Sequence, residues 1–258
     1  MYKYLIFLFI GVPLFAADCI VQTLRAPVTH GAVVATGWTD PYNNNLVVKY
    51  DFNGANPLFS SVGVSTGVNV GAILVDISTN EYGTVNRGYS FDGIDDYLYV
   101  DPHDGSLAPA SNFTVSCKFK IVAFPASARA LMGNAVLGSA GWMWWGQTSF
   151  SAFGYRENGV MYNDFQSTAT NTWYHTIWTY SGRYWIIYNN AAWKATDDSI
   201  TYHYIVNTTN HLYLGGDMNG QYDHVACVID DVRIYTNLVL NTNMQAVLYT
   251  NMPLERLP

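Results

Sequence analysis

Residues 89–100, with the sequence YSFDGIDDYLYV, constrain the fold more than any other stretch of the chain. Gly93 supplies the positive φ that a sharp turn needs, and the aspartates beside it tolerate and cap turns. The aromatic and β-branched residues on either side of this corner are typical of strands. The corner therefore predicts two strands of a sheet, each with one face buried against another part of the chain.

Short apolar runs follow one another along the chain at a spacing of roughly ten residues, separated by Gly and Asn turns. The expected strands are residues 46–52, 70–75, 89–91, 97–100, 113–122, 131–137, 141–146, 150–155, 159–165, 173–180, 184–188, 212–214 and 225–235. One short C-terminal helix is expected after Asn241, which can cap it. This pattern predicts an all-β fold, a sandwich or a jelly roll of antiparallel strands.

An apolar leader opens the sequence. Lys3 precedes an apolar run that ends in small residues, so residues 1–16 have the layout of a secretory signal peptide. This run is too short for a comfortable membrane span, and we find no later run that is long enough. Cys19 raises the alternative of a lipid anchor, although Asp18 stands where lipid attachment favours a small residue. We therefore expect a secreted protein, extracellular or at the cell surface.

After the leader, we expect an extended lead-in over residues 17–45, one domain over residues 46–251 and a tail over residues 252–258. The lead-in could donate a strand to a neighbouring copy and so support self-association. Three cysteines allow one disulfide. Cys19–Cys227 is a possible bridge, whereas Cys117 alternates with core-type residues and is expected to be a small buried hydrophobe.

The charge pattern excludes several classes of function. The net charge is −7, only 12% of the residues are charged, and we find no Lys/Arg cluster that would indicate nucleic-acid binding. Glycoside hydrolysis needs two carboxylates at a fixed separation. After the leader, the chain has only Glu81, Glu157 and Glu255, and it has no Glu-x-Asp-x-Glu strand. The sequence therefore predicts a protein that is not an enzyme.

Several segments resemble one family, the laminin-G-like, concanavalin A-like jelly-roll domains. The similar segments are, in family order, residues 89–100 (YSFDGIDDYLYV), 113–120 (FTVSCKFK), 173–180 (WYHTIWTY), 186–190 (IIYNN), 212–215 (LYLG) and 229–235 (IDDVRIY). Two positions depart from the family pattern: Lys118 stands where Trp is common, and Asn190 where Gly is common. Asn also tolerates the left-handed conformation, so the turn at Asn190 can survive. The resemblance implies two antiparallel sheets stacked face to face as a jelly-roll sandwich.

The resemblance also implies a structural calcium ion. Calcium binds six to eight oxygen ligands, commonly carboxylates mixed with backbone carbonyls. In similar jelly rolls an acid at the position of Asp230 and a carbonyl near Gly93 hold the ion, and Asp51 is a weaker addition from an N-terminal strand. In the alternative interpretation, these aspartates only cap turns and pair with Arg233 or Arg87.

Aromatic residues gather in the middle third of the chain and are candidates for carbohydrate contact. An exposed flat ring is a platform for the apolar face of a sugar, and neighbouring polar side chains can bond the hydroxyls. The candidates are Trp142, Trp144, Trp145, Tyr155, Tyr184 and Trp185. Residues 141–146 (GWMWWG) alternate along a strand, so we expect one face of this strand to be exposed.

These observations predict a secreted, non-catalytic binding module for extracellular carbohydrate. The fold alone implies little about activity, because it hosts lectins, adhesion modules and glycan-cleaving enzymes. The first alternative is a structural or adhesive surface subunit that contacts other protein chains. The second is a glycan-cleaving enzyme, which the missing carboxylate pair disfavours.

Overall fold

The computed structural model describes residues 40–53, 57–58, 60, 66–79, 85–100, 112–127, 129–134, 140–147, 150–157, 160–181, 185–190, 192–197, 211–216, 224–241 and 244. The chain divides into two units, Met1–Trp38 and Thr39–Pro258, and every described residue belongs to the second. The predicted signal peptide, most of the lead-in and the tail lie outside the described residues.

The described residues form two antiparallel sheets. The first has the order β13-β12-β11-β6-β15-β4-β3, with β1 paired to β15 off this path. Its strands are β1 (Leu46–Tyr50), β3 (Ile73–Thr79), β4 (Val85–Asp92), β6 (Phe113–Ala123), β11 (Trp173–Tyr180), β12 (Trp185–Asn189), β13 (Ala192–Asp197) and β15 (Ala226–Thr236). A short 3₁₀ turn, η1 (Asn43–Asn45), precedes β1.

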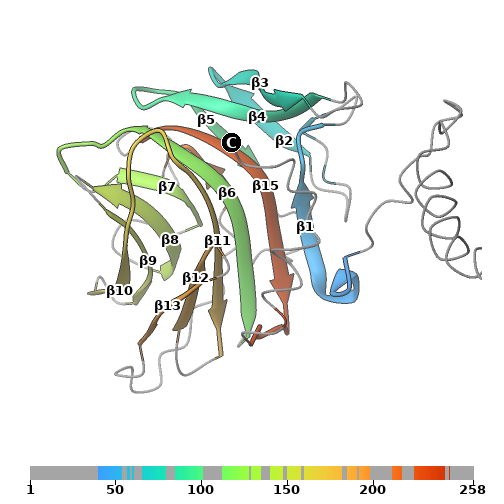
Figure 1. The fold of residues 1–258 in the computed structure, drawn as a ribbon, viewed down its shortest axis with the longest axis vertical. Helices are drawn as coiled ribbons and strands as arrows, with labels where there is room; N and C mark the ends of the chain where they lie inside the picture. The colour runs from blue at the N-terminus through green and yellow to red at the C-terminus, as the bar shows by residue number, and fades with distance from the viewer. Residues whose placement is uncertain are drawn as a thin grey trace, which may run out of the picture. The chain divides into compact units, whose positions relative to one another are not determined.

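The second sheet has the order β10-β9-β8-β7-β14-β5-β2. Its strands are β2 (Gly67–Val70), β5 (Tyr97–Val100), β7 (Arg129–Gly133), β8 (Ala140–Gln147), β9 (Phe150–Glu157), β10 (Val160–Ser167) and β14 (Leu212–Leu214). Figure 1 shows the long strands β6, β11 and β15 side by side in one layer and β7 to β10 in the other. The predicted all-β jelly-roll sandwich is thus confirmed.

Large aromatic side chains join the two sheets. In β6, alternate residues turn inward, and Phe113 and Phe119 both belong to the apolar core. The Phe119 ring meets Trp144 of β8 edge-on, with 4.8 Å between ring centroids. Trp144 in turn lies 6.0 Å from Trp178 of β11. Because these rings come from opposite sheets, burying them holds the sandwich together.

The corner that dominates the sequence forms as expected between β4 and β5. Gly93 has a φ of +80°, and the carboxylate of Asp92 accepts the backbone N–H of Ile94 at 2.7 Å. A side chain at Gly93 would place its Cβ 2.6 Å from the backbone nitrogen of Ala226, so glycine is required there. Asn190 has a φ of +48°, which confirms that Asn takes the left-handed position where glycine is common.

Some elements differ from their predicted form. The expected strand over residues 70–75 is divided by Gly71, whose φ of +83° sends the chain from β2 in the second sheet to β3 in the first. Of the C-terminal helix, the structure describes Met244, whose N–H is capped by the side chain of Asn241 at 3.0 Å. Cys117 and Cys227 are both free and buried, so Cys227 forms no bridge to Cys19. Among the described residues, no helix has the length and apolarity needed to span a membrane.

Candidate functional site

The tryptophans predicted to contact sugar are buried. Trp142 and Trp144 are 0% exposed and Trp145 is 5% exposed. Trp142 and Trp144 face the core between the sheets, while Trp145 and Met143 point to the opposite face of β8 and are buried there too. The expectation that one face of this strand is exposed was therefore wrong. The reason is that β8 is an inner strand, flanked by β7 and β9, and both of its faces are covered.

For the other three predicted contact residues, the structure describes at most the backbone. Tyr155 lies in β9, paired with Trp142 of β8, and Trp185 opens β12 opposite Tyr180. The side chains of Tyr155 and Trp185 are outside the described part, as is the whole of Tyr184. Their contact with sugar stays a prediction.

The three predicted calcium ligands do not form one coordination sphere. Gly93 packs against Ala226, four residues before Asp230 on β15, which separates the two by about 13 Å along an extended strand. Asp51 is held by Lys49, with Nζ and Oδ2 3.3 Å apart. Calcium binding itself stays a prediction, which calcium titration calorimetry would test.

Asp51 and Asp230 are nevertheless connected through two asparagines. The Asp51 carboxylate accepts the N–H of Asn53, the Asn53 amide donates to Asn86, and the Asn86 amide donates to Asp230 at 3.2 Å. The second carboxylate oxygen of Asp230 is buried and has no hydrogen-bond partner among the described residues. Burial, with the neighbouring charge of Asp231, raises the pKa of Asp230 to about 7.

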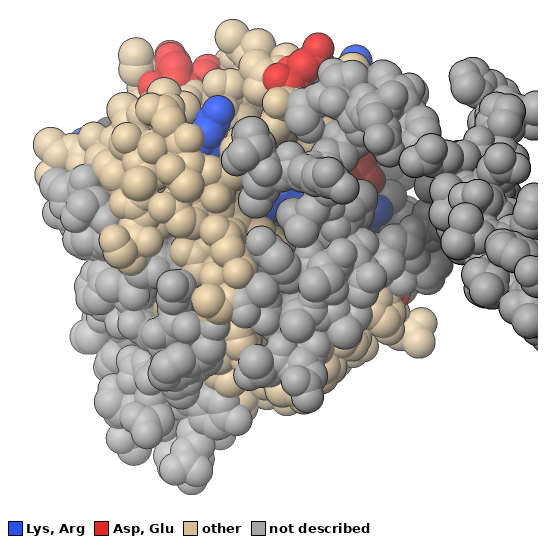
Figure 2. Space-filling model, in the orientation of Figure 1, with Lys and Arg blue, Asp and Glu red and all other residues tan. Residues whose placement is uncertain are grey.

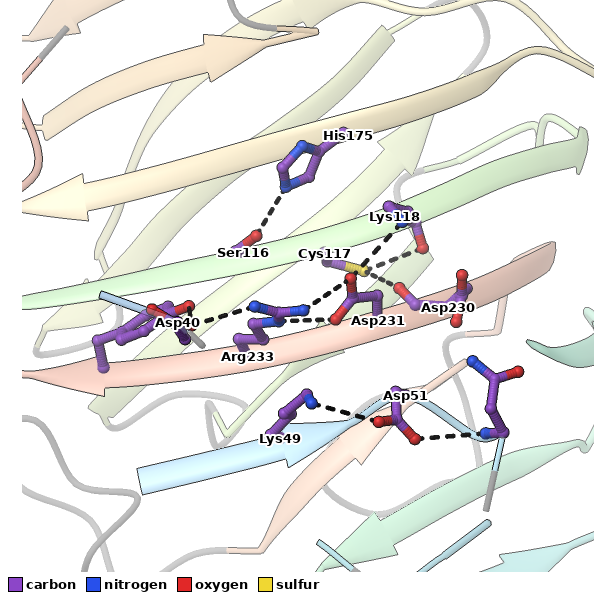
Figure 3. Close-up of polar contacts among 12 residues, drawn as sticks. Asp40, Lys49, Asp51, Ser116, Cys117, Lys118, His175, Asp230, Asp231 and Arg233 are labelled. Atoms are coloured by element: carbon purple, nitrogen blue, oxygen red, sulfur yellow. Dashed lines mark hydrogen bonds and ion pairs between the residues drawn. The ribbon is translucent and has the colours of Figure 1, made fainter. Parts of the chain in front are cut away.

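A buried polar network covers the face of the first sheet that is turned away from the core. Its members are Asp40, Ser116, Lys118, His175, Asp231, Arg233 and Tyr235. Figure 3 shows the guanidinium of Arg233 between Asp40 and Asp231, with Lys118 on the far side of Asp231. Arg233 donates to both oxygens of Asp231, at 2.7 and 3.2 Å, and to Asp40 at 3.0 Å. The network ties the segment before β1 to the centre of the sheet.

A bulge in β15 makes this arrangement possible. The pairing of β15 with β6 shifts register between Asp230 and Arg233, and Asp231 has a φ of +49°. Burial alone would raise the pKa of Asp231, but Arg233 and Lys118 hold it below its usual range. Lys118, which replaces a common aromatic residue of the family pattern, thus serves as a second buried cation, with its Nζ 3.6 Å from the Asp231 carboxylate. The network fixes structure through charges that compensate each other.

The network also contains a serine–histidine pair. The Ser116 hydroxyl lies 2.8 Å from Nε2 of His175. Both residues are buried, so a substrate cannot reach the hydroxyl oxygen. Burial, together with the positive charge of Lys118, lowers the pKa of His175 to about 3, so the ring is neutral at ordinary pH. The geometry makes this pair a structural contact.

A cluster of aromatic rings lies on the outer face of the second sheet, with Tyr97, Tyr99 and His211 partly exposed and the other two rings buried. This aromatic patch consists of Tyr97, Tyr99, His211, Tyr213 and His224. Tyr99 stacks on His211 at 5.3 Å, and Tyr97 lies 5.9 Å from Tyr213. In β5 these tyrosines alternate with Leu98 and Val100, which face the core. The patch is therefore built on β5, on β14 with the residue before it, and on the segment that precedes β15.

Exposed aliphatic side chains border the aromatic patch. Val68 and Val70 of the edge strand β2 are paired in register with Tyr99 and Tyr97, so they share the same face. Val68 is 43% exposed, and Ile94, at the tip of the corner before β5, is 74% exposed. These aliphatic side chains therefore extend the apolar character of this face beyond the rings.

An acidic turn adjoins the aromatic patch. Asp92, Asp95 and Asp96 place carboxylate oxygens within 4.8 Å of one another, directly before Tyr97. Asp96 is buried and accepts the N–H of Asp92 at 3.0 Å, and burial raises the pKa of its carboxyl. The ring of His224 contacts the backbone oxygen of Asp96 at 3.2 Å and so connects the turn to the patch. Figure 2 shows acidic side chains at the upper edge, where Figure 1 places β3, β4 and β5.

Sequence reasoning missed the aromatic patch, although its signal is present. Tyr97 and Tyr99 alternate with Leu98 and Val100, so a half-buried strand must present the two tyrosines on the face opposite the core. Tyr213 stands in the same way between Leu212 and Leu214. Chemically, the patch offers the partly exposed rings and hydroxyls of Tyr97 and Tyr99, with the carboxylates of the acidic turn before them in sequence. Such a surface can bind a ligand, and it contains no nucleophile activated by a base.

Comparisons with known proteins agree with this architecture. A family model described as the concanavalin A-like lectin/glucanases superfamily matches residues 92–242. A search of curated protein sequences found no significant match.

Solved structures with the same fold include binding domains of bacterial toxins. The botulinum neurotoxin serotype D ligand binding domain, in complex with N-acetylneuraminic acid, has a TM-score of 0.67 and 16% identity over 82% of this chain and 52% of that one. The binding domain of Paraclostridial Mosquitocidal Protein 1 has a TM-score of 0.66 and 14% identity, over 81% of this chain and 52% of that one. The botulinum neurotoxin DC binding domain, in complex with rat synaptotagmin II, has a TM-score of 0.64 and 13% identity, over 81% and 52%. This chain spans about half the length of those domains, and the likeness establishes the fold.

Proposed function

The chain belongs to the concanavalin A-like lectin/glucanase superfamily, and on that premise we propose that it is a non-catalytic module that binds extracellular carbohydrate through the aromatic patch. The observation that carries the proposal is the partial exposure of Tyr97 and Tyr99 on the outer face of the second sheet, in register with the exposed Val70 and Val68. Tyrosine rings stack on the apolar face of a sugar while their hydroxyls bond its polar groups. The extracellular location rests on the predicted leader over residues 1–16.

The toxin binding domains of the same fold support a role in binding. One of them is in complex with N-acetylneuraminic acid and another with a protein, rat synaptotagmin II. Because this chain matches about half of each domain, those ligands support a role in binding and do not identify a ligand for this chain. The proposal therefore commits to carbohydrate on the basis of the patch itself.

A glycan array followed by calorimetry tests the proposal. The wild-type protein should bind a subset of glycans, and Tyr99→Ala should weaken that binding at least tenfold, because it removes a stacking ring. Tyr42→Ala is the matched control: it removes another partly exposed tyrosine, near β1 in the first sheet, and should leave the affinity unchanged. Folded protein that binds no glycan, or that binds equally well without Tyr99, would contradict the proposal.

A protein-binding role is the second candidate, and the exposed aliphatic border favours it. Val68, Val70 and Ile94 are more typical of a protein contact than of a sugar site. In that case, the protein would form oligomers or capture a protein partner without binding sugar, and Val70→Asp would abolish the association. Sedimentation analysis of the wild type and this variant separates the two candidates. Release of product from a bound glycan would instead support the enzyme alternative.

A further inference from the structure

We propose that His211 positions the ring of Tyr99 for contact with a sugar, so that the ligand is centred on the Tyr99 side of the aromatic patch. This inference rests on the proposed carbohydrate-binding function and adds to it a positioning residue and a place for the ligand. It starts from a difference between the two partly exposed tyrosines. A second ring is stacked on Tyr99, whereas no ring of a described residue is stacked on Tyr97.

Strand register brings His211 to Tyr99. Tyr99 of β5 pairs directly with Tyr213 of β14, and His211 comes two residues before Tyr213. His211 is therefore the diagonal neighbour of Tyr99 on the outer face of the sheet, at a separation that aromatic side chains can bridge. The centroids of the two rings lie 5.3 Å apart, with 28° between the ring planes. The imidazole thus restrains one side of the Tyr99 ring.

A buried residue holds His211 in turn. Its Nδ1 lies 3.5 Å from the hydroxyl oxygen of Tyr213, and the centroids of the two rings lie 6.1 Å apart. Tyr213 is 9% exposed, and its strand is also paired with β7, where Tyr213 lies opposite Gly133. The imidazole therefore connects the partly exposed ring of Tyr99 to a side chain that is fixed within the sheet.

Tyr97 lacks a stacked neighbour of this kind. The three rings near it, those of Tyr213, His224 and Tyr99, have centroids 5.9, 6.2 and 6.3 Å away and planes tilted by 45°, 41° and 34°. On the edge strand β2, the residue opposite Tyr97 is Val70, which is 37% exposed. A tilted ring restrains the rotation of its neighbour less than a stacked ring does, so Tyr97 keeps more freedom than Tyr99.

The consequence for binding is entropic. A side chain that loses rotamer freedom when a ligand binds weakens the binding by about threefold to tenfold. Tyr99 avoids much of this cost because His211 already holds its ring, whereas Tyr97 does not avoid it. A sugar therefore gains more from stacking on Tyr99. Removing the imidazole should weaken binding even though both tyrosines remain.

Three substitutions of His211 test this role on one glycan array, after which the glycan that binds the wild type most strongly is titrated by calorimetry. His211→Ala removes the stacked ring and should weaken binding about threefold to tenfold. His211→Phe keeps a ring without nitrogens and should stay within about twofold of the wild type, because the stack is retained. His211→Asn keeps hydrogen-bonding groups without a ring and should bind as weakly as His211→Ala. Binding that His211→Asn keeps and His211→Phe loses would overturn the positioning role, because His211 would then contact the sugar through its nitrogens.

A double-mutant cycle shows whether His211 acts through Tyr99. In the Tyr99→Ala background, His211→Ala should cause no further loss of affinity, because the ring that it positions is gone. Tyr42→Ala again serves as the control outside the patch, and urea denaturation establishes that each variant is folded under the conditions of binding. Losses that multiply in the double variant would overturn the inference, since His211 would then act independently of Tyr99.

The outcomes distinguish this inference from the function on which it rests. If Tyr99→Ala weakens binding and His211→Ala does not, the inference fails and carbohydrate binding stands. If Tyr97→Ala weakens binding more than Tyr99→Ala, the ligand is centred on the other tyrosine and the inference is wrong. If no glycan of the array binds to the folded wild-type protein, the proposed function fails and the inference fails with it.

Discussion

The outer faces of the two sheets differ in how deeply their side chains are buried. On the first sheet, charged residues such as Arg233, Asp231 and Lys118 are buried on the face turned away from the core. On the second sheet, Tyr97 and Tyr99 remain partly exposed on the corresponding face. Charged groups are therefore buried on one outer face, whereas two aromatic rings are partly exposed on the other.

The difference arises from what lies over each face. On the first sheet, the segment after β15 crosses back: Thr114 donates to the carbonyl of Leu238 at 2.9 Å, and Leu240 donates to Thr179 at 3.0 Å. Asp40, from the segment before β1, adds its carboxylate to Arg233 and Tyr235. Because water cannot reach a covered face, each charged side chain on it needs an oppositely charged or hydrogen-bonding partner within the protein. The aromatic patch keeps part of its surface open to a ligand.

The largest effect is expected from removing the central cation of the covered face. Arg233→Met leaves two buried carboxylates, Asp40 and Asp231, with their main partner gone. Removing one partner of a buried charge network costs about 3–5 kcal/mol of unfolding free energy. Urea denaturation of the variant against the wild type measures this loss.

Arg233→Lys serves as the companion variant. Lysine keeps the positive charge but cannot reproduce the two parallel bonds to Asp231, so the loss should be smaller than for Arg233→Met. A loss below about 1 kcal/mol for Arg233→Met would mean that the network contributes little and that the covered face is held by other contacts.

The next effect separates a buried ring from a displayed one. Trp144→Ala removes a fully buried ring that packs on Phe119 and Trp178, and should cost about 3 kcal/mol or more of unfolding free energy. Tyr99→Ala should cost about 1 kcal/mol at most, because its ring is partly in water already. Thermal and urea unfolding of the two variants test the comparison. Equal losses would contradict the assignment of Tyr99 to an exposed surface.

Much of the fold could be predicted from sequence because the alternation of apolar and polar residues along a strand indicates which side chains face the core. In β6, every second residue from Phe113 to Ile121 faces the core as the pattern predicts, although the residues between them are mostly buried as well and the strand is not half-buried. The corner at Gly93 has the turn chemistry that its sequence demands. The resemblance to a known family supplied the two-sheet arrangement that local patterns leave open. It did so although the family's common Trp is replaced by Lys118, which Asp231 compensates.

The site was harder to predict. The alternation of side chains along a strand indicates on which face of the sheet a residue lies, but it does not indicate whether another segment covers that face. Trp145 points away from the core, as the pattern allows, yet it is 5% exposed. Tyr99 also points away from the core and stays partly open. The difference depends on segments distant in sequence, which no local pattern reports. The register shift at Asp231, which gathers the buried charges, has no local signal either.

Acid should weaken the covered face through a single histidine. Burial first, and then the charges of Lys118 and Arg233, lower the pKa of His175 to about 3, while Asp231 opposes them. The unfolded chain binds a proton near the ordinary histidine pKa of about 6.5, so it holds more protons than the folded state between these two values. Stability therefore falls as the pH drops from about 6.5, by up to about 1.4 kcal/mol per pH unit from this group.

His175→Gln should remove this contribution and leave the opposite one of Asp230, whose raised pKa of about 7 makes the folded state bind more protons than the unfolded chain over the same pH range. The slope of unfolding free energy against pH should therefore fall below that of the wild type. Ser116→Ala is the matched control: it removes the hydroxyl that contacts Nε2 but keeps the buried imidazole, so the wild-type slope should remain. Urea denaturation of the three proteins at several pH values gives the slopes. A wild-type slope retained in His175→Gln would show that another group causes the loss.

The smallest effect is expected from an ion pair of the same chemistry on an exposed surface. Arg87 of β4 contacts Asp76 of β3 with Nε and Oδ1 3.2 Å apart, and the two side chains are 41% and 69% exposed. Exposed pairs contribute about 0–1 kcal/mol, since water solvates both charges when the contact breaks. Arg87→Met should therefore shift the urea midpoint only slightly, and added salt should leave the shift small. A loss as large as that of Arg233→Met would mean that burial does not set the strength of these arginine–aspartate contacts. A small loss would confirm that the buried ion pairs on the outer face of the first sheet contribute more to the free energy of unfolding because that face is covered.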